Sequence, residues 1–176
     1  MKKILTLCIA VLMAATTVKA QHEIGGIVGG LNGASYKYWL NDKLALQADL
    51  GVGLFRTYGG SYYKGNKGGE GTASYYDFTI NPNVLYHFEL PANFKFYLGG
   101  GLNLGLLSNI DNTSTAGIQG KFGLNGVVGA SYDLANTPLV LALDFRPGYG
   151  LGFKDADNAH LSFFDWKIGF AVRYKL

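Results

Sequence analysis

The sequence predicts an all-β fold, a transmembrane antiparallel up-and-down β-barrel of eight strands. Apolar residues alternate with polar or small residues along most of the chain, which is the period of a β-strand. Several alternating runs last eleven to thirteen residues, which suits tilted membrane-spanning strands (about 9–11 residues) better than globular ones (about 5–6). Charged residues make up only 15% of the chain and glycine reaches 26 residues, a composition unlike that of an average soluble domain.

The first twenty residues are expected to form a cleaved signal peptide. Two lysines precede an apolar run over residues 4–15, and Val18-Lys19-Ala20 has the small-residue pattern of a cleavage site. The apolar run is shorter than the ~20 residues that a membrane-spanning helix needs. We therefore expect export, cleavage after residue 20, and a barrel domain over residues 21–176.

Loss of this leader changes the charge balance. It removes three lysines from a chain of net charge +3 and leaves twelve basic and twelve acidic residues. Because a nucleic-acid-binding surface needs a basic excess, no nucleic-acid partner is expected. The single cysteine, Cys8, lies in the leader, so the barrel has no disulfide and must be held by its core or its hydrogen-bond ladder.

Alternation defines six strands clearly. In the last one, six apolar residues from Trp166 to Leu176 share one face, and Lys167, Gly169, Ala171, Arg173 and Lys175 share the other. The six runs are Leu44–Leu54, Tyr76–Phe88, Phe94–Leu106, Lys121–Asp133, Leu139–Tyr149 and Trp166–Leu176.

Two further strands are expected in the glycine-rich residues 22–40. We divide this part around Leu31-Asn32-Gly33, because Asn-Gly favours a tight turn. Pro82 and Pro147 fall inside strand patterns, and each removes one ladder donor. We therefore expect a bulge, or a position near the rim, at each proline.

The connections alternate between short and long. Short turns at residues 41–43, 91–93 and 135–138 alternate with longer segments at 57–74, 108–117 and 154–160. Outer-membrane barrels have short periplasmic turns and longer outer loops. The pattern predicts an outer-membrane protein with both ends of the barrel domain on the periplasmic side.

The non-apolar face distinguishes a membrane barrel from a soluble barrel with an apolar interior. This face is mostly glycine with isolated charges of both signs, whereas a water-facing surface would carry many Lys and Glu residues. Small residues with a few long ones suit the narrow interior of an eight-stranded barrel, and buried charges of both signs can pair. The predicted polar network of the lumen comprises Lys37, Asp49, Asp77, Lys95, Lys121, Asp133, Asp144, Arg146, Lys167 and Arg173.

The last strand resembles the assembly signal of outer-membrane barrels. Lys167, Gly169, Val172 and Tyr174 match its polar, glycine, hydrophobic and aromatic positions, and Leu176 stands where Phe is more common. With the strand plan, residues 21–176 resemble the OmpA/OmpX-type family of eight-stranded outer-membrane barrels. This resemblance implies insertion into outer-membrane lipid by the barrel-assembly machinery, and we expect a monomer.

We expect a structural, adhesion or surface-interaction role, with the lumen plugged by its own polar side chains. The segment Thr57–Ser74, which sets tyrosines and lysines among glycines, is the expected contact surface for a surface ligand. A narrow, porin-like channel is the alternative.

A catalytic or metal site at the outer rim is a weaker alternative. Asp155, Asp157, His160 and Ser162 could resemble the rim site of lipid A palmitoyltransferases, and the first three could bind a metal. Those enzymes begin with an amphipathic helix, whereas residues 21–30 are predicted to be a glycine-rich strand, and the metal spacing is unspecific. We expect no enzymatic activity, no cofactor and no metal.

Overall fold

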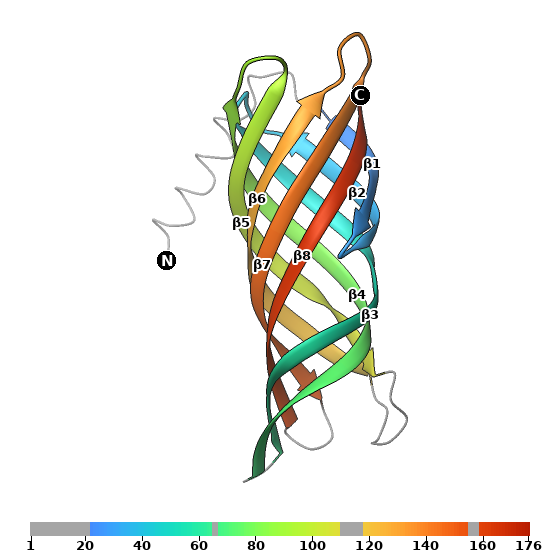
Figure 1. Cartoon of the computed structure of the whole chain (residues 1–176), viewed down its shortest axis with the longest axis vertical. Helices are drawn as coiled ribbons and strands as arrows, with labels where there is room; N and C mark the ends of the chain where they lie inside the picture. Colours follow the sequence, from blue (N-terminus) through green and yellow to red (C-terminus); the bar gives the residue numbers. More distant parts are fainter. Residues whose placement is uncertain (1–21, 65–66, 110–117, 155–158) are drawn as a thin grey trace, which may run out of the picture.

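The computed structural model is a closed antiparallel barrel of eight strands, as predicted (Figure 1). It describes the backbone of residues 22–64, 67–109, 118–154 and 159–176, and the side chains of residues 22–53, 76–108, 120–153, 162 and 164–176. The strands are β1 (His22–Gly29), β2 (Asn32–Trp39), β3 (Leu44–Lys64), β4 (Lys67–Glu89), β5 (Phe94–Asn109), β6 (Ile118–Asp133), β7 (Leu139–Lys154) and β8 (Ala159–Lys175). Within these ranges no helix is long and apolar enough to cross a membrane.

Strand alternation separates the outside of the barrel from the inside. On β3, Leu46 and Leu50 are 41% and 45% exposed, whereas Gln47 and Asp49 are 2% and 0% exposed. The described parts of the other long strands repeat this arrangement, with large apolar residues outward. An apolar exterior around a polar interior is the arrangement of a membrane barrel, and closure leaves no strand edge in the hydrocarbon. The predicted lipid-facing side is therefore confirmed.

The number of strands that form the wall changes along the barrel axis. β1 and β2 have eight residues each, whereas the other strands have 16 to 23. Beyond the β1–β2 turn, β3 pairs directly with β8, from Gly59 opposite Phe164 to Tyr63 opposite His160. The opposite end, where Figure 1 shows the C-terminus beside the β4–β5 and β6–β7 turns, is the periplasmic end in the predicted orientation.

The expectation of a long loop over Thr57–Ser74 is wrong for the backbone. β3 continues to Lys64 and β4 begins at Lys67, with a continuous ladder from Thr57 opposite Ser74 to Lys64 opposite Lys67. Glycines break the apolar alternation here, so the sequence pattern loses its strand signal. The antiparallel ladder needs only backbone groups, and pairing with β8 supports it further.

The β1–β2 turn lies earlier than predicted. Asn32 and Gly33 belong to β2, and the chain turns at Gly30 and Leu31. Gly29 has φ of 119°, a conformation that favours glycine. The Asn32 side chain accepts a hydrogen bond from the Gly29 N–H (3.1 Å) and donates one to its carbonyl (3.2 Å), so Asn32 stabilises the turn from within the strand.

The two strand prolines cause neither a bulge nor a position at the rim. β4 and β5 keep one register on both sides of Pro82, although the pairs at positions 81 and 82 are missing. The Leu102 carbonyl, which lies opposite Pro82 and lacks its N–H donor, accepts a hydrogen bond from Asn81 Nδ2 (3.1 Å). A side-chain amide thus replaces the lost backbone donor. The register shift of this wall lies instead between Gly53 and Arg56.

A similar arrangement accompanies Pro147 on β7. The β6–β7 register is the same before and after it, and the pairs at positions 146 and 147 are missing. Asn125 Nδ2 lies 3.5 Å from the carbonyl of Gly126, the residue opposite Pro147. The same Nδ2 donates to Asn83 Oδ1 (2.7 Å), which links the two proline regions across the lumen.

Candidate functional site in the barrel lumen

The lumen contains a balanced set of charged side chains. Among the described residues, five cations and five acids are buried, none more than 4% exposed. They are Lys37, Lys121, Arg146, Lys167 and Arg173, with Glu23, Asp49, Asp77, Asp144 and Asp165. Charged side chains can be buried in a narrow interior when charges of opposite sign are balanced and paired.

One ion pair crosses the whole lumen near its middle. Arg146 on β7 donates from Nη1 to Asp49 Oδ2 on β3 (2.7 Å), and these strands lie four positions apart in a ring of eight. Arg146 also donates from Nε and Nη2 to the two oxygens of Asp144 (2.9 Å each). Gln47 adds a bond to Asp49 (2.8 Å), and the Tyr97 hydroxyl one to Asp144 (3.3 Å). One guanidinium therefore holds two carboxylates from different sides of the barrel.

A second cluster lies closer to the outer end. Lys121 Nζ on β6 contacts both oxygens of Asp77 on β4 (2.5 and 2.6 Å) and donates to the Thr79 hydroxyl (2.7 Å). The Thr79 hydroxyl in turn donates to Asp77. On β8, Lys167 pairs with Asp165 at 2.8 Å. Both pairs are buried, and in each of them the lysine charge is compensated by the neighbouring aspartate.

Aromatic rings surround a buried lysine toward the periplasmic end. Lys37 Nζ lies 3.3 Å from His87 Nε2, and 5.5 and 4.8 Å from the ring centres of Trp39 and Tyr97. The His87 ring lies 4.3 Å from that of Trp39 and 5.0 Å from that of Tyr97. Trp39 Nε1 donates to Glu23 Oε1 (2.7 Å). Cation–π attraction and ring packing hold this cluster together.

Two members of the predicted network lie at the rim and not in the buried lumen. Lys95 and Asp133 pair at 3.5 Å, with side chains 23% and 24% exposed. Lys175 joins them at 2.8 Å from Asp133. They share the strand parity of the lumen residues but lie at the strand ends, where the barrel meets solvent.

Some buried polar atoms lack a hydrogen-bond partner among the described residues. Arg173 donates from Nε to the Ser35 hydroxyl (2.8 Å), but its Nη1 and Nη2 have no such partner. Acceptors in the same situation include Glu23 Oε2 and Asp49 Oδ1. Arg173 is fully buried, so the pairing of the lumen is least complete around it.

Sequence reasoning missed two buried acids, Glu23 and Asp165. The alternation that places Lys167 inside also places Asp165 inside, but the predicted last strand began one residue after it. Glu23 lies within the predicted first strand, but it was not assigned to the lumen face, and in the structure it is opposite Lys37. Extending the last strand by one residue would have identified Asp165, and following the parity of the first strand would have identified Glu23.

The residues of the predicted assembly signal divide between the two faces. Lys167 and Gly169 face the lumen, and Val172, Tyr174 and Leu176 are exposed. A Cβ at Gly169 would lie 2.9 Å from both Asp144 Oδ1 and Ile27 Cδ1. The glycine of this pattern therefore also meets a packing requirement of the lumen.

Most residues of the rim site considered as a weaker alternative fall outside the described part of the molecule. Asp155 and Asp157, and the side chain of His160, are not described. Among the described residues, no group of three His, Cys, Asp or Glu side chains could hold a metal ion. The leader over residues 1–20 also lies outside the described residues.

Comparisons with known proteins identify similar folds. No protein-family model matches the sequence, and no curated protein matches it either. The barrel is similar to Neisserial surface protein A (20% identity, 89% of this chain and 94% of that chain covered, TM-score 0.49). It is also similar to the N-terminal β-barrel domain of Pseudomonas aeruginosa OprF (19%, 89% and 96%, TM-score 0.48). A third similar structure is a major outer membrane protein of Thermus thermophilus (17%, 90% and 100%, TM-score 0.48). At such low identity, this similarity carries no information about function.

Proposed function

We propose that this small barrel is an outer-membrane anchor with a closed lumen and that it acts through its surface. The observation that carries the proposal is the Arg146–Asp49 pair between opposite strands. The Lys121–Asp77 pair and the aromatic cluster around Lys37 support it at other levels. Ions would have to break these contacts to pass, since an eight-stranded barrel has an interior that side chains just fill.

Planar-bilayer conductance tests the closed lumen. The wild-type protein is expected to give no stable single-channel steps. The double variant Asp49→Ala/Arg146→Ala, which removes one charge of each sign from the crossing, is expected to give small steps. The matched control Lys95→Ala/Asp133→Ala removes the rim pair and is expected to remain silent. Stable steps from the wild type would support the narrow-channel alternative.

The extended β3–β4 hairpin is the proposed interaction surface. Residues Lys67–Ser74 of β4 pair with β3 on one side, and the ladder to β5 begins only at Tyr75 opposite Asn109. Among the described residues, the other edge of this stretch therefore has no strand partner. An exposed edge can add an extended strand through main-chain hydrogen bonds, over about 27 Å for eight residues.

A shortened hairpin tests this surface. Gly59 and Thr72 are opposite each other, so an Asn-Gly turn can replace residues 60–71. This change also removes four of the five β3–β8 pairs, so heat-dependent gel mobility must first show that the shortened barrel is folded. Binding of an array of extended peptides to the reconstituted barrel is expected to be lost in this variant. Peptides N-methylated at alternate residues, which lack the donors, are expected not to bind the wild type. Equal binding by the shortened barrel would contradict the proposal.

Export and assembly complete the proposal. We propose that residues 1–20 direct export and are cleaved, that the last strand directs insertion by the barrel-assembly machinery, and that the barrel is a monomer without enzymatic activity. The support is the leader pattern and the match of the last strand to the assembly signal. The mature mass after outer-membrane fractionation tests the first part, and the heat-dependent gel mobility of a Tyr174→Ala variant tests the second.

A further inference from the structure

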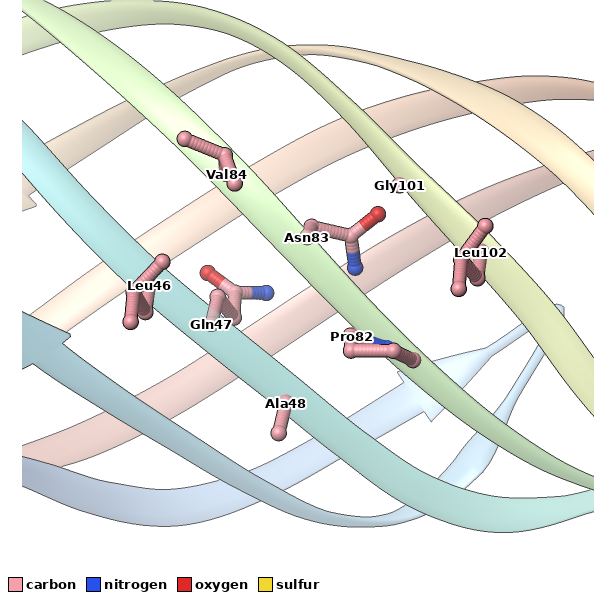
Figure 2. Close-up of a pocket in the computed structure, with 8 residues that line it drawn as sticks. All are labelled: Leu46, Gln47, Ala48, Pro82, Asn83, Val84, Gly101 and Leu102. Atoms are coloured by element: carbon pink, nitrogen blue, oxygen red, sulfur yellow. The ribbon is translucent and has the colours of Figure 1, made fainter. Parts of the chain in front are cut away.

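The lipid-facing wall contains a hollow of about 430 Å³ over residues 82–84 of β4. Figure 2 shows its eight lining residues on three neighbouring strands, β3, β4 and β5. The outward-facing side chains among them are all apolar: Leu46, Ala48, Pro82, Val84 and Leu102. The hollow therefore offers hydrocarbon contacts to whatever occupies it.

The hollow results from small side chains in register. Ala48 lies opposite Pro82, and Leu46 lies opposite Val84 on the same two strands. Ala48 and Pro82 project little from the wall, while Leu46, Val84 and Leu102 rise around them. Pro82 is also the point where two β4–β5 pairs are missing. The hollow thus overlies one of the gaps in the ladder of the wall.

The position of the hollow places it deep in the membrane. Tyr76 and Tyr86, both exposed, lie about 20 and 14 Å from Pro82 along β4, and exposed aromatics of this kind suit the headgroup boundaries. Lys43, exposed at the periplasmic turn, lies about 17 Å from Ala48 along β3. With the strands tilted by about 40°, this length corresponds to about 13 Å of depth, close to half of the ~30 Å hydrocarbon core, which is the reach of one leaflet's acyl chain.

We propose that the hollow is a binding site for the end of one acyl chain of a periplasmic-leaflet phospholipid, whose phosphate lies near Lys43. The hollow of about 430 Å³ is open on its lipid side, so it has room for several methylene groups, at ~30 Å³ each. Dispersion contacts favour filling it, because an empty hollow forfeits them. A second barrel fits poorly, since two convex walls touch along a line and bury far less than the ~1,200 Å² of a stable interface.

Photolabelling with a defined lipid tests the site. The protein is reconstituted in vesicles of phosphatidylglycerol that carries a diazirine at the methyl end of one chain. Labelling of the five outward-facing residues of the hollow is expected to exceed that of Leu143, which is at least as exposed to lipid, about tenfold, the factor given by a preference of ~1.4 kcal/mol. Ala48→Phe fills the hollow and is expected to abolish the excess. Ala130→Phe, at an exposed alanine on β6, is expected to leave it intact.

Further experiments identify which lipid supplies the acyl chain. Lys43→Gln is expected to reduce the excess labelling, and lipid A with the same diazirine is expected to give none. Even labelling around the barrel would overturn the site. Excess labelling by lipid A, or an excess unchanged in Lys43→Gln, would overturn the phospholipid assignment. Disulfide-linked dimers of an Ala48→Cys variant, in a barrel without other cysteines, would show a second copy as the occupant and also overturn it.

Discussion

Replacing Arg146 with leucine is the most direct test of the lumen network. Arg146 donates to Asp49 at 2.7 Å and to Asp144 at 2.9 Å, and all three residues are buried. Removing one partner of a buried ion pair costs about 3–5 kcal/mol, because the remaining charge is left uncompensated. Here two carboxylates lose their cation, although Asp49 keeps its bond to Gln47 and Asp144 its bond to Tyr97. We expect a loss of about 3–5 kcal/mol in the free energy of unfolding.

Urea unfolding in lipid vesicles measures this loss. The fluorescence of Trp39, which lies in the lumen cluster, and the gel mobility of unheated protein report the transition. Adding Asp49→Asn and Asp144→Asn to Arg146→Leu removes the unpaired charges and is expected to restore more than half of the loss. A loss below about 1 kcal/mol, the size expected for an exposed pair, would refute the reasoning. Failure of the two asparagines to restore stability would refute it as well.

Three further predictions concern the wall, and vesicle unfolding measures each of them. Leu46→Arg puts a cation into the hydrocarbon and is expected to cost about 2–4 kcal/mol; a neutral effect would mean that this face does not meet lipid. A Cβ at Gly101 would lie 2.0 Å from the Pro82 carbonyl oxygen, whereas one at Gly120 meets nothing within 4 Å. Gly101→Ala is therefore expected to cost about 1–3 kcal/mol and Gly120→Ala almost nothing; equal costs would argue against close strand contact. Asn81→Leu removes the donor to the Leu102 carbonyl and is expected to cost about 1–3 kcal/mol, and less in a Pro82→Ala background that regains a backbone N–H. The same cost in both backgrounds would contradict the role of Asn81.

Strand parity made the two faces of the wall predictable. Side chains two residues apart share a face whatever the neighbouring strands do, so Leu46 outside and Asp49 inside follow from local sequence. Parity does not report depth along the axis. Lys95 and Asp133 were therefore placed in the buried network, although the structure has them at the rim.

The partners of the lumen charges could not be predicted in the same way. Arg146 and Asp49 are 97 residues apart, and they meet only because the closed barrel puts β3 and β7 opposite each other. The stagger between strands decides which charges lie at one level, and no local pattern encodes it. The link from Asn81 to the Leu102 carbonyl has the same origin, since it depends on the β4–β5 register.

The hairpin over Thr57–Ser74 was missed for another reason. Glycines at 59, 60, 68, 69 and 71 remove the apolar alternation that identifies a strand, and residues of this kind normally indicate a loop. The ladder persists because pairing uses backbone groups, and β8 supplies a second partner over Gly59–Tyr63. Long-range pairing of this kind overrides local propensity.

The charged lumen also determines which face of each strand meets lipid. A slip of one residue in strand pairing exchanges the two faces. A slip of one strand would bring that strand's own cations into hydrocarbon, at about 2–4 kcal/mol for each one near the midplane. These cations are Lys37 on β2, Lys121 on β6, Arg146 on β7, and Lys167 and Arg173 on β8. An apolar lumen of the same volume could be equally stable, but both faces would then be apolar and a slip would cost little. The buried ions thus contribute more to the uniqueness of the fold than to its stability, so substitutions that neutralise all of them at once should lower strand-register fidelity before they lower the free energy of unfolding.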